Sequence, residues 1–396
     1  MFVAKRKDGS FITLMDLKNT QELELKGDKN QGFFCPACGA EVRVKNGEIR
    51  RIHFAHVQAE CRAATEPETW YHLEGKDKLY KVLQDYGATQ LESFIPQTKQ
   101  RADILLETDR KFAFEFQCSS INPSTLKRRT KLYESILITP IWLIGKEKLG
   151  AVDTHMKLST FQWAFLQNHS SDSSPYLLSF CPQQSLFYYL FPTFSFSSLD
   201  TYLTYQSSKE WQLEPKLITS KNKPMYWKTK WLHHKKQWRY NYCLYKQNQQ
   251  LRYYCYNKMH IPLSLFPAEI GLPVPSSYWF QTPIIQWQAW LYFDSIYKTP
   301  VSSIIHVPSI VKRFNQRIKQ SFIKVKDLPL VKYGHYEDAI KEYLMLLELL
   351  GILEKESSII YRKKKKEMPY THLEEASVQD KQVLERILQI QEGKDI

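Results

Sequence analysis

Long apolar runs are missing from this 396-residue sequence. The longest stretch without a charged residue covers residues 173–199, and it contains Pro175, Pro182 and Pro192 among serines and glutamines. A membrane-spanning helix needs ~20 mostly apolar residues whose backbone groups are paired internally. The sequence therefore predicts no membrane span.

Three further features are scarce or incomplete. The first residues, MFVAKRKDGSF, lack the apolar run of a signal peptide, so we expect a cytoplasmic protein. Seven cysteines are an odd number for a disulfide framework, and clustered cysteines in a reducing compartment more often bind metal. Glycine is scarce, at 13 residues, but hydrophobic residues make up 43% of the chain, which excludes disorder throughout.

Acidic residues are fewer than basic ones, 41 against 55, and the net charge is +14. This excess favours a polyanionic partner, either nucleic acid or an anionic surface. The charge is uneven, because residues 201–260 contain 12 Lys or Arg and only 2 Glu. A solvated basic surface without a partner is the alternative interpretation.

The length predicts two or three domains at ~100–200 residues each. Composition divides the chain into three regions, and the predicted fold class is α+β. Residues 1–64 are expected to be β-rich with a zinc-ribbon-like cysteine and histidine cluster, and Asp8-Gly9 marks a hairpin. Residues 65–150 alternate helix and strand, and residues 151–396 form a basic, aromatic-rich and mainly helical region.

The middle region has the pattern αβββαβ. A helix is expected over residues 66–86, followed by the strands LESFIPQ, ADILLET and KFAFEFQ. Asn122-Pro123-Ser124 then starts a second helix, which precedes the strand TPIWLIG. Near the C-terminus, a helix over residues 336–350 precedes two short strands, which is typical either of a winged helix or of a generic helical subdomain.

The segment FFCPACG…HFAH…C contains candidate zinc ligands. The Cys35-x-x-Cys38 turn directs two thiolates to one ion, and structural zinc takes four tetrahedral nitrogen or sulfur ligands. We expect His56 and Cys61 to complete the set, because their spacing fits better than that of His53 and His56. His53 remains the rival ligand, and unligated buried side chains are the alternative.

The strand KFAFEFQ has two different faces. Glu115 and Gln117 are two residues apart, so they share one face. Phe112, Phe114 and Phe116 share the other face and are expected to pack into a core.

Asp103 lies on the preceding strand and is predicted to be next to Glu115. If the hairpin is centred near Asp109, residues whose numbers sum to about 218 pair across it. Adjacent carboxylates repel unless a cation lies between them, and Mg²⁺ takes oxygen ligands while keeping waters for a substrate phosphate. The pair predicts a catalytic Mg²⁺ or Mn²⁺ site in which Gln117 positions water or phosphate, although an exposed acidic pair on a hairpin is the alternative.

The first helix adds Glu68 and His72, which are four residues apart on one face. The αβββαβ order is the core of the PD-(D/E)xK restriction-endonuclease-like fold, in which a residue of the first helix often joins the metal site. Glu68 and His72 are therefore auxiliary catalytic candidates, and a solvated helix end is the alternative.

Four motifs together resemble the competence protein CoiA family of naturally transformable Gram-positive bacteria. They are CPACG with HFAH, WYHLEGK, RADILLE with AFEFQCSSI, and LKRRTKLY with IWLIG, over about residues 1–150. The resemblance implies a zinc-finger-like N-terminal region, a nuclease-like middle domain and a helical C-terminal region. It also implies that Asp103, Glu115 and Gln117 form the family's nuclease-like triad.

The broader nuclease superfamily usually has lysine where Gln117 stands, and glutamine can only form hydrogen bonds. Lys111 and Lys99 are close in sequence and are candidates for the missing cation. The following helix carries Lys127, Arg128 and Arg129 as candidate phosphate contacts, with a solvated helix face as the alternative.

Residues 221–258 interleave basic residues with Trp and Tyr. Trp227, Trp231 and Trp238 fall on one helical face, which favours core packing over base stacking. The basic residues expected on the outer faces, as candidate DNA contacts, are Lys228, Lys230, Lys235, Lys236 and Arg239.

The sequence thus predicts a CoiA-type nuclease that processes internalised DNA and promotes recombination. Single-stranded or branched DNA and recombination proteins are the expected partners. The first alternative is a non-catalytic DNA-binding or adaptor protein that recruits the recombination machinery. The second is a transcription regulator that uses the winged-helix-like segment.

Overall fold

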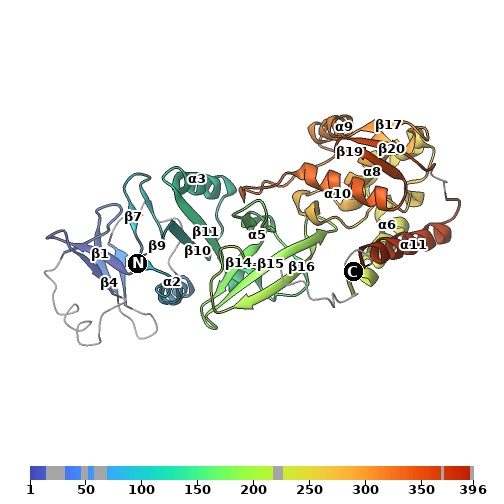
Figure 1. Cartoon of the computed structure of the whole chain (residues 1–396). Helices are drawn as coiled ribbons and strands as arrows, with labels where there is room; N and C mark the ends of the chain where they lie inside the picture. The colour runs from blue at the N-terminus through green and yellow to red at the C-terminus, as the bar shows by residue number, and fades with distance from the viewer. Residues whose placement is uncertain (15–31, 46–51, 58–68, 217–225, 367–369, 393–396) are drawn as a thin grey trace.

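The computed structural model describes residues 1–14, 32–45, 52–57, 69–216, 226–366 and 370–392. Figure 1 shows a small sheet at the N-terminal end, a large mixed sheet in the middle and a helical region at the other end. None of the helices in the described part of the chain is long and apolar enough to span a membrane.

The N-terminal sheet has five strands, and its first two form the hairpin predicted at Asp8-Gly9. Gly9 has a φ of +90°, a conformation that favours glycine and closes the turn. The strands, in spatial order, are β2 (Phe11–Thr13), β1 (Val3–Arg6), β3 (Phe33–Phe34), β4 (Glu41–Lys45) and β5 (His53–His56).

The central sheet has eight strands and is mixed. Strand β11 pairs in parallel with both β10 and β14, and the remaining neighbours in the sheet are antiparallel. The strands, in spatial order, are β12 (His155–Lys157), β16 (Asp200–Ser208), β15 (Leu186–Ser195), β14 (Leu177–Cys181), β11 (Ile138–Gly145), β10 (Lys111–Gln117), β9 (Ile104–Glu107) and β6 (Ala88–Leu91).

Two helices cover the two faces of this sheet, α2 (Trp70–Leu83) on one and α3 (Pro123–Glu134) on the other (Figure 1). Phe112, Phe114 and Phe116 are buried in the same cluster as Leu79 and Leu83 of α2, which confirms the predicted core face of β10. The order αβββαβ recurs as α2, β6, β9, β10, α3 and β11, but the first strand was predicted in the wrong place. Two short strands, β7 (Phe94–Ile95) and β8 (Gln100–Arg101), lie between β6 and β9. Residues 91–97 contain only the last residue of β6, followed by a turn and the short β7.

Helix α3 begins where the sequence predicts. The Oδ1 atom of Asn122 accepts a hydrogen bond from the backbone N–H of Ser124 at 2.9 Å, and Pro123 occupies the first turn. This cap satisfies a donor that the helix itself leaves unpaired.

The predicted boundary at residue 150 is wrong as a boundary of the fold, because the central sheet continues to Ser208. The uncharged stretch over residues 173–199 supplies the whole of β14 and of β15. Strands that are buried on both faces form near-continuous apolar runs without the polar alternation that marks a half-exposed strand. The prediction of a mainly helical region after residue 150 therefore holds only for the part of the chain that follows β16.

The helical region follows β16. Its final part has a helix, a strand, two helices and a hairpin, with the strand order β17-β20-β19, which is the arrangement of a winged helix. The predicted helix and two strands correspond to α10, β19 and β20. The elements are α6 (Tyr226–Tyr240), α7 (Gln249–Tyr254), α8 (Ile284–Tyr292), β17 (Ile304–His306), α9 (Val307–Lys319), α10 (Tyr336–Leu349), β19 (Leu353–Ser357), β20 (Ile360–Lys363) and α11 (Leu373–Glu392).

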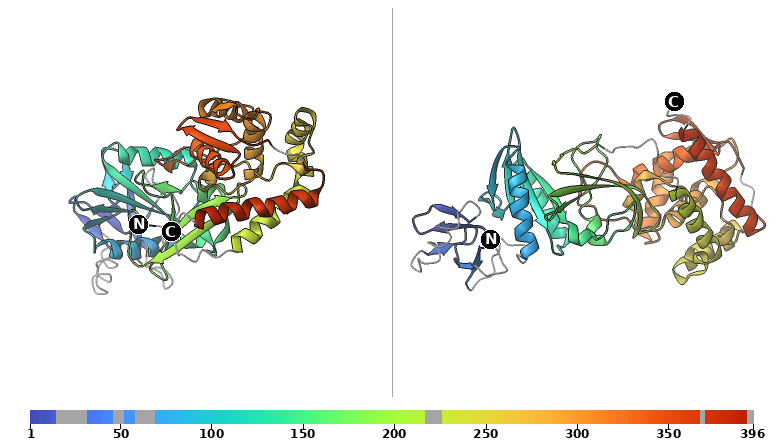
Figure 2. Two further views of the ribbon diagram at one scale, coloured as in Figure 1. Left: turned by 45° about the vertical axis from the view of Figure 1, so that its right-hand side comes forward. Right: turned by 90° about the horizontal axis from the view of Figure 1, so that it is seen from below.

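The helical region is also tied to the central region by backbone pairing. Strand β13 (Gln167–Asn168) of the central region pairs in parallel with β18 (Leu330–Val331) of the helical region. Two short helices, α4 (Lys146–Leu149) and α5 (Thr160–Trp163), precede β13 in the chain. Figure 2 shows the three parts following one another along the molecule.

Glu92 joins the N-terminal sheet to the central region. Its buried carboxylate accepts the backbone N–H groups of Phe2 at 2.8 Å and Val3 at 3.1 Å through Oε2. Its Oε1 atom pairs with Nζ of Lys76 at 2.5 Å. Burial acts to raise the pKa of Glu92, but the charges of Lys76 and the N-terminal amine outweigh it and hold that pKa well below its usual range.

Gly75 tests the contact between α2 and β10. A Cβ atom at this position would lie 1.9 Å from Cε1 of Phe116. We expect Gly75→Ala to lower the free energy of unfolding by about 1–3 kcal/mol, because the added methyl group would overlap Phe116. This loss exceeds the gain in helix propensity, since alanine stabilises a solvent-exposed helix by up to about 1 kcal/mol relative to glycine. Denaturant titration measures the change.

The control is Glu74→Ala, a half-buried neighbour on α2, for which we expect a change below about 0.5 kcal/mol. An unchanged unfolding midpoint for Gly75→Ala would show that α2 does not pack this closely on β10.

Candidate functional site

The register of β9 and β10 places two acidic residues side by side. All four paired positions sum to 218, from Lys111↔Glu107 to Phe114↔Ile104. Asp103 directly precedes β9, so the next position of the same register lies opposite Glu115. The predicted hairpin register is therefore confirmed.

Asp103 is held by two donors from different elements. Its Oδ2 atom accepts the backbone N–H of Phe116 at 3.0 Å and lies 3.5 Å from Nε2 of His72. Burial acts to raise the pKa of Asp103, but the hydrogen bond and charge of His72, the charge of Lys76 and the Phe116 N–H hold that pKa well below its usual range. The site therefore contains an ionised carboxylate at neutral pH.

Glu115 is 3% exposed, and its side chain contacts residues of helix α3. Its Oε1 atom accepts a hydrogen bond from Nη2 of Arg129 at 2.5 Å and another from the hydroxyl of Tyr133. Arg129 also donates to the carbonyl of Arg101 at 3.2 Å. Burial raises the pKa of Tyr133 well above its ordinary value, so the hydroxyl remains a donor to Glu115.

Arg129 corrects one sequence-based prediction. It is 4% exposed and paired with Glu115, so it does not lie on the helix surface as a phosphate contact. Lys127 and Arg128 are exposed on α3, as predicted. The spacing signals this burial, because position 129 lies three residues after the buried Leu126 and four before the buried Tyr133.

The other predicted groups are distributed as follows. His72 reaches Asp103 from the first turn of α2, whereas Glu68 lies outside the described residues. The side-chain amide of Gln117 donates to the carbonyl of Ser119 at 3.1 Å. Lys111 pairs with Glu107 at 3.0 Å, so the cation nearest Glu115 is Arg129 instead.

Two basic residues of α6 are also placed differently from the prediction. Lys235 and Arg239 are each 1% exposed, and both pair with Asp380 of α11, at 2.8 Å and 2.7 Å. They fasten two helices together rather than face solvent. Lys236 is exposed, and Trp231 and Trp238 are buried, which confirms the predicted core face of α6.

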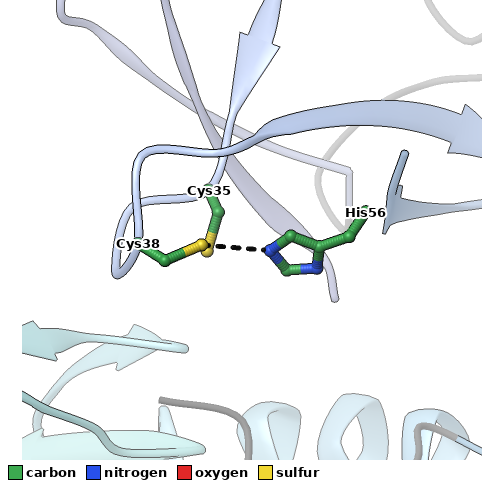
Figure 3. A group of neighbouring side chains, drawn as sticks. All are labelled: Cys35, Cys38 and His56. Carbon is green, nitrogen blue, oxygen red and sulfur yellow. Dashed lines mark hydrogen bonds between the residues drawn. The ribbon is translucent and has the colours of Figure 1, made fainter. Parts of the chain in front are cut away.

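The N-terminal sheet brings three candidate metal ligands together. The ligand atoms of Cys35, Cys38 and His56 all lie within 4.8 Å of one another, and Figure 3 shows the imidazole facing the two sulfur atoms. The Sγ atom of Cys38 is 3.3 Å from Nε2 of His56. Two thiols and one imidazole are the donor types that zinc prefers.

The local backbone explains this geometry. Gly39 has a φ of +72°, and its N–H donates to the carbonyl of Cys35 at 2.9 Å, which closes the turn that carries both cysteines. Side chains alternate along β5, so His53 and His56 face opposite sides. Burial, and then the positive charges of Arg101 and the N-terminal amine, lower the pKa of His56, which favours the neutral, metal-binding imidazole.

Cys61, the fourth predicted ligand, lies outside the described residues. The described residues therefore supply three donors.

The mixed sheet thus has a helix on each face, and the half-buried Asp103, which precedes β9, lies beside the buried Glu115 of β10. Residues 68–223 match the family model described as the nuclease-like domain of competence protein CoiA. Residues 15–64 match the model of the CoiA N-terminal domain, and residues 227–377 match that of the C-terminal domain.

A curated relative shows the same similarity. Competence protein CoiA of Bacillus subtilis (strain 168) is 29% identical over 351 residues, which cover 84% of this chain and 90% of the relative. No solved structure matches the chain. The chain belongs to the competence protein CoiA family, and this membership indicates a role in competence.

The buried ion pair gives a stability prediction. Arg129→Met removes the cation but leaves the Glu115 carboxylate in the interior, and we expect a loss of about 3–5 kcal/mol in the free energy of unfolding. Denaturant titration measures it. Lys127→Met, on the exposed face of the same helix, is the control, with an expected change below about 0.5 kcal/mol.

The double variant Arg129→Met/Glu115→Gln should regain part of the loss, because it no longer buries an uncompensated charge. Equal stabilities of Arg129→Met and Lys127→Met would contradict the ion pair.

Proposed function

We propose that the protein is a metal-dependent nuclease of the cytoplasm that processes internalised DNA during competence and promotes its recombination. The observation that carries this proposal is the register of β9 and β10, which sets Asp103 beside Glu115. The order of α2, β6, β9, β10, α3 and β11 supports a restriction-endonuclease-like core.

The donor chemistry fits the proposal. Asp103 and Glu115 would hold Mg²⁺ or Mn²⁺ through carboxylate oxygens, and such an ion supplies Lewis-acid stabilisation and an activated water. His72 keeps Asp103 ionised and oriented. Gln117 would position water or a phosphate oxygen.

The surface of α3 supports binding of the substrate. Lys127 and Arg128 are exposed on this helix, which directly follows the strand that carries Glu115. They would contact DNA phosphates and so hold the strand near the two carboxylates.

One observation favours a second candidate, a non-catalytic DNA-binding or adaptor protein. Arg129 and Tyr133 already compensate the charge of Glu115 without a metal ion. Gln117 also brings no positive charge to the site, unlike the lysine of the broader superfamily. In this case the carboxylates would serve the fold, and the protein would recruit recombination proteins to DNA.

The cleavage test uses isosteric variants. Asp103→Asn and Glu115→Gln should each reduce cleavage of labelled single-stranded, duplex or branched DNA with Mg²⁺ or Mn²⁺ by at least about 100-fold. Asp103→Asn keeps the side-chain shape, so DNA binding should be retained. Glu115→Gln also leaves the buried Arg129 without its partner, so its melting temperature is measured alongside its DNA binding. Gel analysis of the products measures the rate.

Asp109→Asn, in the exposed turn of the same hairpin, is the matched control and should cleave as wild type does. Absence of cleavage by wild type, with equal DNA binding by all variants, would support the adaptor instead.

We further propose that Cys35, Cys38, His56 and Cys61 bind a structural zinc ion. The chain should contain about one zinc ion, and His56→Ala or Cys38→Ser should reduce the content toward zero and lower the melting temperature. Elemental analysis of purified protein measures the content.

His53→Ala and Cys118→Ser are the controls, because neither residue belongs to the three-ligand cluster, and both should retain zinc. Loss of zinc in His53→Ala with retention in His56→Ala would reverse the assignment.

A further inference from the structure

A cleft of about 690 Å³ lies between the central region and the helical region. Its walls come from the start of α3, from α5, from residues 197–199 and from three segments of the helical region. The carboxylates and the cysteine cluster of the proposed function are not among its lining residues.

Lys326 is the unusual feature of this cleft. It is 7% exposed, its Nζ donates to the carbonyl of Tyr278 at 2.9 Å, and it lies 4.0 Å from the centroid of the Trp163 ring. Burial alone lowers the pKa of Lys326 to about 7, with no contribution from a carboxylate among the described residues. The buried site thus disfavours the charged form of this amine, and an anion in the cleft would favour it.

An aromatic platform also lines this cleft. Phe322 stacks on Trp290 with ring centroids 5.0 Å apart and an interplanar angle of 14°. The guanidinium of Arg317 lies on Trp290 at 4.0 Å from the ring centroid, and it pairs with Asp294 at 2.7 Å. The platform is therefore fixed, and the half-buried Phe322 borders the cleft.

The remaining lining is rich in amides, and the carboxylate among the lining residues is the exposed Asp327. Gln247, Gln250 and Gln281 are exposed in the cleft, and Lys324 adds a second, exposed cation. Amide side chains both donate and accept hydrogen bonds, as the edges of unpaired bases require. Aromatic rings stack on bases, and lysines pair with phosphates.

We propose that this cleft binds a single strand of DNA, with a phosphate at Lys326 and Lys324 and a base against Phe322 and the glutamines. The proposal rests on the proposed function for the identity of the polymer. Duplex DNA does not fit this chemistry, because its base edges are paired and its ring faces are stacked. The cleft reaches Pro123, the first residue of α3, so the bound strand continues toward the helix that follows β10.

The test measures the affinity of the full-length protein for a fluorescent oligothymidylate by anisotropy, without Mg²⁺ or Mn²⁺, so that no cleavage occurs. Lys326→Met and Lys324→Met should each raise the Kd about tenfold. Lys355→Met, on the exposed strand β19 outside the cleft, is the control and should stay within about twofold of wild type.

A stability readout separates binding from a structural role. Lys326→Met loses the hydrogen bond to the Tyr278 carbonyl, so its melting temperature is compared with that of the wild type, and its Kd is interpreted only where the fold is retained. Lys324 is exposed, so Lys324→Met keeps the test valid even where Lys326→Met does not fold.

Equal Kd values for wild type and both cleft variants would overturn the proposal. Equal losses of affinity for a hairpin duplex and for the single strand would overturn the preference for single strands. Asp103→Asn should bind the oligonucleotide as wild type does, so the failure of the nuclease proposal and the failure of the cleft proposal give different results.

Discussion

The ion pair between Glu115 and Arg129 is the interaction on which the central region depends. It lies where β10 meets α3, and both side chains are almost fully buried. Two charges taken out of water are tolerable only when they are close and their remaining hydrogen-bonding groups have partners. Here the hydroxyl of Tyr133 donates to Glu115, and the carbonyl of Arg101 accepts from Arg129. The pair fixes α3 over this face of the sheet and keeps Glu115 in register with Asp103.

Strand β10 separates two environments within a few residues. Its phenylalanines pack under α2, where Gly75 leaves room for the ring of Phe116. Its other face holds Glu115 and Gln117 against polar groups of α3 and of the loop after the strand. The alternation of side chains along one strand thus places an apolar core and a polar site back to back, and a shift of one residue would destroy both.

The sequence predicted the central part of this arrangement well. Alternation in KFAFEFQ gave the two faces, the turn at Asp109 gave the register, and Asn122-Pro123 gave the start of α3. Burial of Arg129, Lys235 and Arg239 was missed, because charged residues were assigned to the surface. Asp380, the partner of Arg239, is 141 residues away, so no local pattern reveals it. Strand β14 was missed because a strand buried on both faces lacks polar alternation. Strand β15 was missed because most of its half-buried positions are also apolar or aromatic.

The two oxygens of Glu92 have a mechanical consequence. One oxygen is bound to helix α2 through Lys76, and the other is bound to the backbone of the first strand. Rotation of the N-terminal sheet against the central sheet would break at least one of these contacts and leave a buried charge unsatisfied. The connection therefore behaves as a rigid joint rather than a hinge, and torque applied to the N-terminal sheet is transmitted to α2.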